Sequence, residues 1–202
     1  MAITRASQST VKQGLDKSKS FVAGIPPILG RYYLMGSVTV GSGGASSIEF
    51  TDIPPIYKHL QVRGITRVDT GTIQLGMGVR LNGDTGSNYA VHILYGQGSS
   101  AAAAGAASNS HPYVLETIGA SATANAFAAF VLDILDYGDT AKNTTMRGFS
   151  GSDANGSGQV RLGSGLWVDT DAVTSITIEN VSGYDFLQYS TASIYGIGRV
   201  SQ

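Results

Sequence analysis

The sequence predicts an all-β fold, and three observations lead to that prediction. Only 13% of the 202 residues are charged, about half the ordinary level, whereas a helical bundle needs a charged solvent face. The polar residues are mostly small, with 23 Ser, 17 Thr and 27 Gly. From residue 36 onward, short apolar-polar alternations closed by Gly, Asn, Asp or Pro recur at roughly 8–15 residues without a helical period between them. This spacing is typical of an antiparallel β-sandwich or jelly roll.

One segment shows the alternation most clearly. In residues 72–81 the apolar side chains occupy every second position and therefore share one face of a strand. Asn82-Gly83-Asp84 follows directly and predicts a tight hairpin turn before the next strand at 89–95. The remaining strands are expected at 37–40, 47–51, 59–68, 112–118, 127–135, 142–149, 159–168, 172–179 and 186–197.

Three segments depart from simple alternation. The phase of 59–68 is restored if Gly64 forms a β-bulge. The near-continuous apolar run in 127–135 predicts a strand buried on both faces. Residues 96–110 contain six Ala flanked by Gly and Ser. Alanine favours helix, but these flanking residues favour a long loop.

The composition excludes several kinds of protein. Cysteine is absent, which removes disulfides, thiolate metal sites and cysteine nucleophiles. No run approaches 18 consecutive apolar residues, and polar residues occupy the region where a signal peptide would need its apolar stretch. We therefore expect no membrane insertion and no export by such a signal.

Charge separates the first 35 residues from the rest. This segment carries five basic residues against one acidic residue, although the whole chain has a net charge of -1. It shows no sustained strand or helix period, and Pro26-Pro27 stops any element before it. We interpret 1–35 as an extended anchoring arm and 36–202 as the β-sandwich domain.

The arm has too many apolar residues for a solvated tail and too few for a core. We expect it to pack on a neighbouring subunit or a larger body, although an arm folded back on its own domain is the alternative. Nucleic-acid binding is disfavoured because the cations are dispersed, without a dense basic run or a stacking pattern of aromatic residues. The residues expected at virion-anchoring or subunit contacts are Arg5, Lys12, Lys17, Lys19, Phe21, Ile25, Arg31, Tyr32 and Tyr33.

No motif supports catalysis or metal binding. Asp133, Asp136 and Asp139 recur every third residue, but they follow a strand into a turn, where carboxylates diverge. Residues 153–156 open like a calcium loop but lack its closing Glu. Ser164 lies in Gly-Ser-Gly without the nucleophile-elbow context. The sequence therefore predicts no enzyme activity, no metal and no cofactor.

A glycan site is the one ligand site that the sequence supports. Carbohydrate sites on β-sandwiches combine exposed aromatic rings with Asn, Asp and Gly at loop ends. Four aromatic residues lie beside such residues, and Asp169 follows the first of them closely: Trp167, Tyr137, Tyr184 and Tyr189. Half-buried aromatic residues of the core or of a subunit contact give the same pattern.

Several segments together resemble a family of small tailed-bacteriophage virion proteins. The resemblance covers nearly all of residues 38–197, and the start of the chain, 2–7 (AITRAS), fits it as well. The Ala-rich stretch 101–107 departs from the family pattern because it has almost no polar or aromatic side chains. The resemblance therefore gives no support for a receptor contact at this stretch. The segments are 43–64 (GGASSIEFTDIPPIYKHLQVRG), 80–89 (RLNGDTGSNY), 130–137 (FVLDILDY), 165–170 (GLWVDT), 173–178 (VTSITI) and 189–197 (YSTASIYGI).

The resemblance implies a place on the virion surface more firmly than a role there. Together with the absence of cysteine it leads us to expect an external structural protein, assembled in the bacterial host cytoplasm as a homotrimer. Capsid decoration or cement, attached by the arm to phage capsid or tail proteins, is the preferred role. The alternative is a tail-fibre or receptor-binding protein that recognises host surface polysaccharide.

Overall fold

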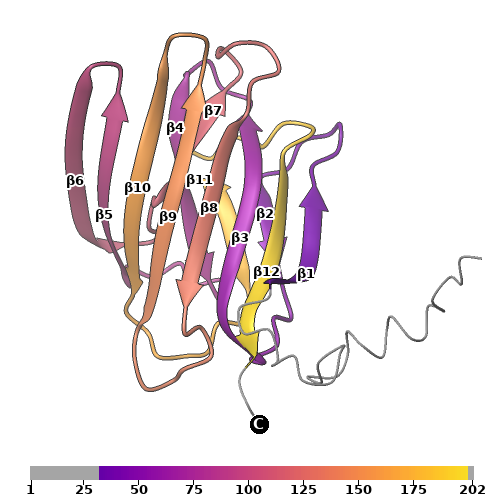
Figure 1. Ribbon diagram of the computed structural model, residues 1–202, viewed down its shortest axis with the longest axis vertical. Coiled ribbons are helices and arrows are strands. Elements are labelled where there is room, and N and C mark those ends of the chain that lie inside the picture. Colours follow the sequence, from indigo (N-terminus) through magenta and orange to yellow (C-terminus); the bar gives the residue numbers. More distant parts are fainter. Residues whose placement is uncertain (1–31, 200–202) are drawn as a thin grey trace, which may run out of the picture. The chain divides into compact units, whose positions relative to one another are not determined.

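The computed structural model describes residues 32–199, and within that range it contains twelve β-strands and no helix (Figure 1). No helix of these residues is long and apolar enough to cross a membrane. The predicted all-β class is confirmed. The strands are β1 (Tyr32–Thr39), β2 (Ser47–Phe50), β3 (Tyr57–Val68), β4 (Gln74–Leu81), β5 (Tyr89–Gln97), β6 (Ser100–Asn109), β7 (Leu115–Gly119), β8 (Ala128–Leu135), β9 (Thr144–Asp153), β10 (Gly158–Trp167), β11 (Ile176–Asn180) and β12 (Thr191–Arg199).

The strands form one large mixed sheet with two runs. The first run is antiparallel throughout, in the order β1-β12-β3-β8-β9-β10-β5-β6. The second run is β2-β11-β4-β7 and lies behind the first in Figure 1. A short parallel pairing of β3 with β7, at Arg67 and Val68, joins the runs. This parallel pair departs from the expected purely antiparallel arrangement.

The hydrophobic core lies between the facing sides of the two runs. From the second run, Met77, Val79 and Leu81 are fully buried, as the alternation in 72–81 predicts. From the first run, Leu132 and Ile134 of β8 belong to the same cluster. Burying each such side chain stabilises the fold by roughly 1.5–3 kcal/mol, so the packing of the two runs is the main source of stability.

The turn at Asn82-Gly83 does not make the predicted hairpin. Both residues have positive φ (52° and 66°) and Asp84 N–H donates to the Leu81 carbonyl, so the tight turn itself forms. However, β4 pairs with β11 and β7, whereas β5 pairs with β10 and β6. The turn therefore carries the chain from one run to the other, because the apolar face of β4 is buried best in the second run.

Three further local predictions are wrong. Gly64 forms no bulge, since β3 keeps continuous register with β8 and β12. A Cβ at Gly64 would lie 2.3 Å from the Thr191 carbonyl oxygen, so close packing explains this glycine. Strand β8 is not buried on both faces but alternates between buried and less buried residues. Residues 96–110 are not a loop but mostly strand β6 and the end of β5, because pairing with β5 satisfies their backbone.

Strand β1 includes the last residues of the predicted arm. Tyr33 stacks on Tyr57 with 5.4 Å between ring centroids, and Tyr32 meets Tyr195 edge-on at 6.3 Å. The Arg63 guanidinium lies 4.6 Å from the centre of the Tyr32 ring. The other predicted contact residues, Arg5, Lys12, Lys17, Lys19, Phe21, Ile25 and Arg31, lie outside the described residues.

A buried arginine organises the connection between β7 and β8. The Arg67 guanidinium donates to the carbonyl oxygens of Ala120, Ala122, Thr123 and Ala126 at 2.7–2.9 Å. Only 7% of Arg67 is exposed. The planar guanidinium group thus donates to four carbonyl oxygens at once, a geometry that the ammonium group of a lysine cannot reproduce.

We expect Arg67→Lys to lower the free energy of unfolding by about 2–4 kcal/mol, because several charge-assisted hydrogen bonds are lost within a buried site. Urea denaturation followed by tryptophan fluorescence measures the effect. Arg63→Lys is the control, since Arg63 is exposed, and it should cost less than about 1 kcal/mol. Equal effects of the two substitutions would contradict the assigned role of Arg67.

Candidate functional site

The most unusual surface of the protein is the outward face of the first run, on the side away from the core. There, Leu162 of β10 lies opposite Phe149 of β9 and Leu94 of β5. Phe149 in turn lies opposite Val131 of β8, and Leu94 lies opposite Ala103 of β6. Five neighbouring strands thus place an apolar side chain in one continuous row.

A second apolar row runs beside the first. Val160 of β10 lies opposite two glycines, Gly151 of β9 and Gly96 of β5. Beyond them the row ends in alanines, Ala129 on β8 and Ala101 on β6. We call the two rows together the apolar patch, formed by Leu94, Gly96, Ala101, Ala103, Ala129, Val131, Phe149, Gly151, Val160 and Leu162.

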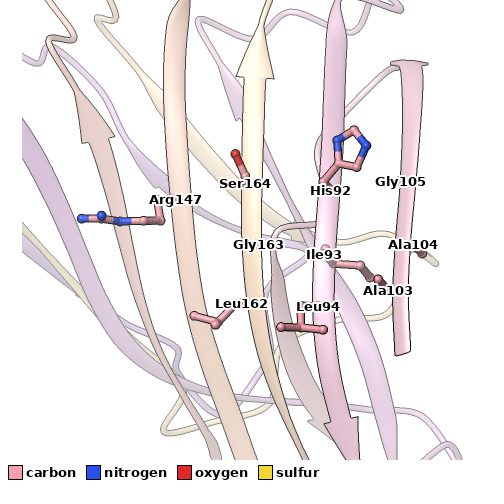
Figure 2. A pocket seen from close by; sticks show the side chains of 10 residues that line it. All are labelled: His92, Ile93, Leu94, Ala103, Ala104, Gly105, Arg147, Leu162, Gly163 and Ser164. Atoms are coloured by element: carbon pink, nitrogen blue, oxygen red, sulfur yellow. The ribbon is translucent and has the colours of Figure 1, made fainter. Parts of the chain in front are cut away.

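The large side chains of the apolar patch are open to solvent. Leu94, Phe149, Val160 and Leu162 are each about half exposed, between 49% and 53%. Together they present on the order of 400 Å² of apolar surface, which is within the size range of the largest apolar patch on a monomeric protein, often a functional surface. Leu94 and Leu162, side by side in Figure 2, line a shallow depression of 660 Å³. The patch is therefore a candidate interaction surface.

Sequence reasoning did not single out this patch, because β10 reverses the usual alternation. Its apolar residues Val160 and Leu162 point outward, whereas Gln159 and Arg161 point into the protein and are buried. Apolar residues at every second position indicate a buried face but do not say what buries it. The sequence of β10 does contain a signal for the patch. Its apolar residues alternate with Gly, Gln and Arg, so the side that faces the protein interior is the less apolar one.

Polar side chains border the apolar patch. Arg147 donates to Asp133 at 2.8 Å, and the Gln61 amide donates to the other oxygen of Asp133 at 2.6 Å. Ser164 and His92 continue the same row toward β5. Arg63 of β3, which is exposed and lies opposite Val131, adds a positive charge at the end of the apolar row. The border is therefore polar, as the rim of a protein interface is.

The residues predicted for a glycan site have different surroundings. Trp167 is only 2% exposed, stacks on Tyr89, and donates its indole N–H to Asp84 at 2.7 Å. Its predicted role as an exposed stacking platform is therefore wrong. Asp169 accepts the Asp171 N–H and so caps a turn. Tyr184 is exposed, in the connection that follows β11.

Asp136 lies in the turn after β8, as the sequence predicts, whereas Asp133 lies within β8 itself. Asp136 accepts hydrogen bonds from the ammonium groups of Lys142 and, at 2.8 Å, of Lys58. These hydrogen bonds lower the pKa of Asp136 to about 2. Asp153 accepts the N–H groups of Asn155 and Gly156 in a tight turn. Among residues 32–199 no group of three or more His, Asp or Glu could hold a metal ion.

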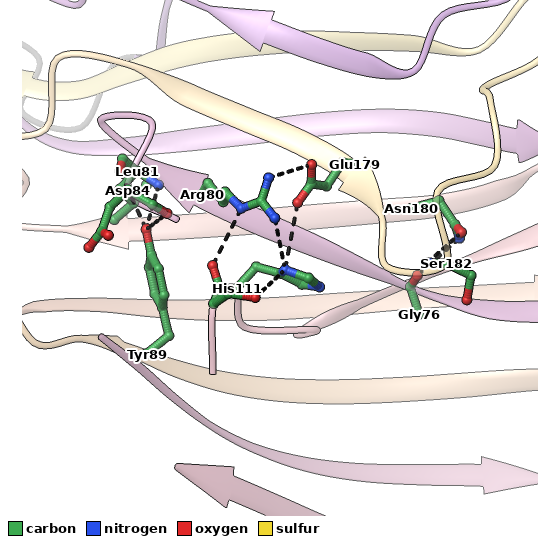
Figure 3. A network of polar contacts seen from close by, with 10 residues as sticks. Gly76, Arg80, Leu81, Asp84, Tyr89, His111, Glu179, Asn180 and Ser182 are labelled. Atoms are coloured by element: carbon green, nitrogen blue, oxygen red, sulfur yellow. Dashed lines mark hydrogen bonds and ion pairs between the residues drawn. The ribbon is translucent and has the colours of Figure 1, made fainter. Parts of the chain in front are cut away.

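A polar network covers part of the second run (Figure 3). Arg80 of β4 donates to Glu179 of β11 at 2.9 Å, and His111 lies 3.6 Å from the same carboxylate. Desolvation lowers the pKa of His111, and Arg80 acts in the same direction while Glu179 opposes it. The His111 ring lies over Gly78, where a Cβ would come within 2.4 Å of it. The network is thus packed against the sheet and has a structural role.

Glu116 of β7 is the one fully buried carboxylate among the described residues. Arg161 lies 3.6 Å from it, Ser152 donates to it at 3.4 Å, and the side chain of Gln159 faces it. Burial raises the pKa of Glu116 to about 7, and the opposing effect of Arg161 is smaller. Because no solvent reaches this carboxyl group, it is part of the core rather than a catalytic acid.

Glu116 makes stability depend on pH. Its pKa is about 7 in the folded chain against an ordinary 4.5, so between these values the folded state holds a proton that the unfolded state releases. The stability that Glu116 contributes is therefore fully present below pH 4.5 and falls by about 2–3 kcal/mol as the pH rises from 4.5 to 7. Urea unfolding at several pH values, compared with Glu116→Gln, measures this. The free energy of unfolding of the parent minus that of Glu116→Gln should decline with rising pH. If the two free energies changed in parallel with pH, the raised pKa would not belong to Glu116.

Comparison with known proteins adds no relative to these observations. No family model, no curated protein and no solved structure matches the chain.

Proposed function

We propose that this protein is an external structural subunit of a bacteriophage virion, with capsid decoration or cement as its role. The observation that carries the proposal is the apolar patch, an exposed surface that serves no core and no catalytic group of the described residues. An all-β body without cysteine suits a particle protein that must fold in a reducing cytoplasm and then persist outside it. The resemblance of 38–197 to small phage virion proteins supports the same role.

In this proposal the two runs of strands are the layers of a jelly-roll-like sandwich, and the apolar patch joins the copies of a homotrimer. Covering the patch would contribute on the order of 10 kcal/mol per copy, which is comparable with the entropic cost of association. Such a contact forms best at high local concentration, as on a particle surface. Residues 1–31 supply the cationic and apolar attachment to phage capsid or tail proteins.

The patch can be tested without disturbing the core. We expect the double variant Phe149→Ser/Leu162→Ser to lose trimer formation by at least tenfold, because half-exposed apolar surface is removed from the contact. The same variant should keep its thermal unfolding midpoint within a few degrees, since neither side chain packs in the core. Sedimentation equilibrium and calorimetry give the two readouts. Thr145→Ser, also outward on β9, is the control, and unchanged trimer formation by the double variant would contradict the proposal.

The position on the virion follows from copy number. Quantitative mass spectrometry of purified particles should find this chain in numbers comparable with the capsid subunits if it is a decoration protein. A far smaller number would place it on the tail. Absence from purified particles would refute the virion role altogether.

A receptor-binding role is the second candidate, and Tyr189 is the observation that favours it. Its side chain is 65% exposed at the rim of a cleft of 560 Å³ that also has Asn125, Asp185 and Gln188 in its lining. The Tyr189 backbone has φ of 74°, a left-handed conformation that costs a bulky residue roughly 1–3 kcal/mol. An exposed ring beside amide and carboxylate groups is suited to stacking on and hydrogen bonding with a sugar of host polysaccharide.

This second role predicts a specific loss of binding. On a glycan array, Tyr189→Ala should lower the signal at least tenfold, whereas Tyr189→Phe should retain it because the stacking ring is preserved. Tyr184→Ala distinguishes this cleft from the glycan site that the sequence predicts, since Tyr184 does not line the cleft and its loss should leave the signal unchanged. The receptor role is excluded if the parent protein gives no signal on the array.

A further inference from the structure

Strand β6 is an open edge of the sheet. It lies at the end of the first run and, among the described residues, pairs only with β5 (Figure 1). Its ten residues, SAAAAGAASN, are exposed or half-exposed throughout, and Ala106 is the one residue of the strand that packs against the core cluster. One full row of backbone N–H and C=O groups is therefore available to another strand.

Natural sheets protect such edges with charged residues, proline, bulges or short strands. Strand β6 has neither charge nor proline. Its one irregularity of register with β5 lies at its C-terminal end, between the pairs Tyr89/Asn109 and Val91/Ala106, and from Val91/Ala106 to Gln97/Ser100 the register is unbroken. Residues 100–106 therefore form a regular edge without these protective features.

The hairpin that precedes β6 defines which backbone groups are free. Gly98 and Ser99 form a two-residue loop with positive φ at Gly98, and Gln97 pairs with Ser100 as the closing pair. A closing pair of this kind exchanges both of its hydrogen bonds. Counting from it, the N–H groups of residues 102 and 104 point toward β5, whereas those of Ala101 and Ala103 point to the open edge.

We propose that β6 pairs with the β6 strand of a second copy of this chain. A two-fold axis perpendicular to the sheet makes two copies of an edge strand antiparallel, which is the pairing used throughout the first run. The side chains of β6 are nearly all methyl groups or hydrogen, so two such strands approach without a clash. They also carry no feature that would select a different protein.

Charge supports a second copy as the occupant. Residues 85–115 contain no Asp, Glu, Lys or Arg, so β5 and β6 of two copies meet without the like-charge repulsion that ordinarily prevents self-pairing. Leu94 lies opposite Ala103, and Figure 2 shows it beside the Ala103–Gly105 stretch of β6. Pairing at the edge would therefore join the apolar patches of two copies into one wider face. The edge contact is distinct from the contact through the patch itself.

Single cysteines provide the first test, because the chain has none of its own. In a two-fold antiparallel pair only a residue near the axis faces its own copy, at a distance that a disulfide can span. We expect oxidative cross-linking of Ala101→Cys, Ala102→Cys, Ala103→Cys and Ala104→Cys to peak at one or two positions. Ala124→Cys, exposed outside the strands, is the matched control. Equal cross-linking at all five positions would overturn the proposal.

Proline provides the second test. Ala103→Pro removes an N–H from the open edge and leaves the pairing with β5, so association through β6 should fall at least tenfold while the unfolding midpoint is retained. Ala103→Ser should associate as the parent does. Measured by sedimentation equilibrium in the Phe149→Ser/Leu162→Ser background, the chain should be a dimer that Ala103→Pro converts to a monomer. A monomer in that background before the proline is introduced, or a dimer that survives it, would refute the pairing without bearing on the patch.

Discussion

The close approach of the backbone at Val114, just before β7, to β9 and β10 is the constraint on which the rest of the structure depends. A Cβ at Gly148 or Gly163 would lie 2.6 Å or 2.3 Å from the Val114 carbonyl oxygen, so only glycine allows the two runs to come this near. Because the backbone at Val114 fills the space beneath the sheet, β9 and β10 have no room for large inward side chains there. The bulky residues that follow Gly148 and precede Gly163, Phe149 and Leu162, lie on the outward face.

This constraint links the core to the surface. The inward face of β10 carries Arg161, which lies 3.6 Å from Glu116 of β7, together with glycine. The outward face carries the apolar side chains that a core strand would ordinarily bury. A protein that worked as a monomer would gain little from this arrangement, since an exposed apolar face favours aggregation. The arrangement is physically consistent for a chain whose outer face is covered by other copies or by a particle.

The open edge of the sheet at β6 is likewise consistent with contact to another copy, although here the contact is made by backbone groups and not by the face of the sheet. An alanine strand adds almost no buried area to its own subunit, so its contribution to the free energy of folding is small. Its neutral, unbranched surface is instead suited to close contact with another backbone. The apolar patch and the β6 edge adjoin each other, and both lie in the part of the first run that is farthest from β1. Association surfaces are therefore concentrated on one side of the run.

The sequence by itself determined the all-β class, the positions of most strands, the buried face of β4 and the turn chemistry of the aspartates. These features are local, because a strand alternates with period two and a turn requires particular φ angles whatever surrounds it. Tertiary structure decided the rest. The partner of β4 depends on which run can bury its apolar face, and β6 is a strand only because β5 offers it hydrogen bonds. The burial of Trp167 and the exposure of Leu162 were likewise decided by packing, since one sequence pattern fits either side of a sheet until its neighbours are in place.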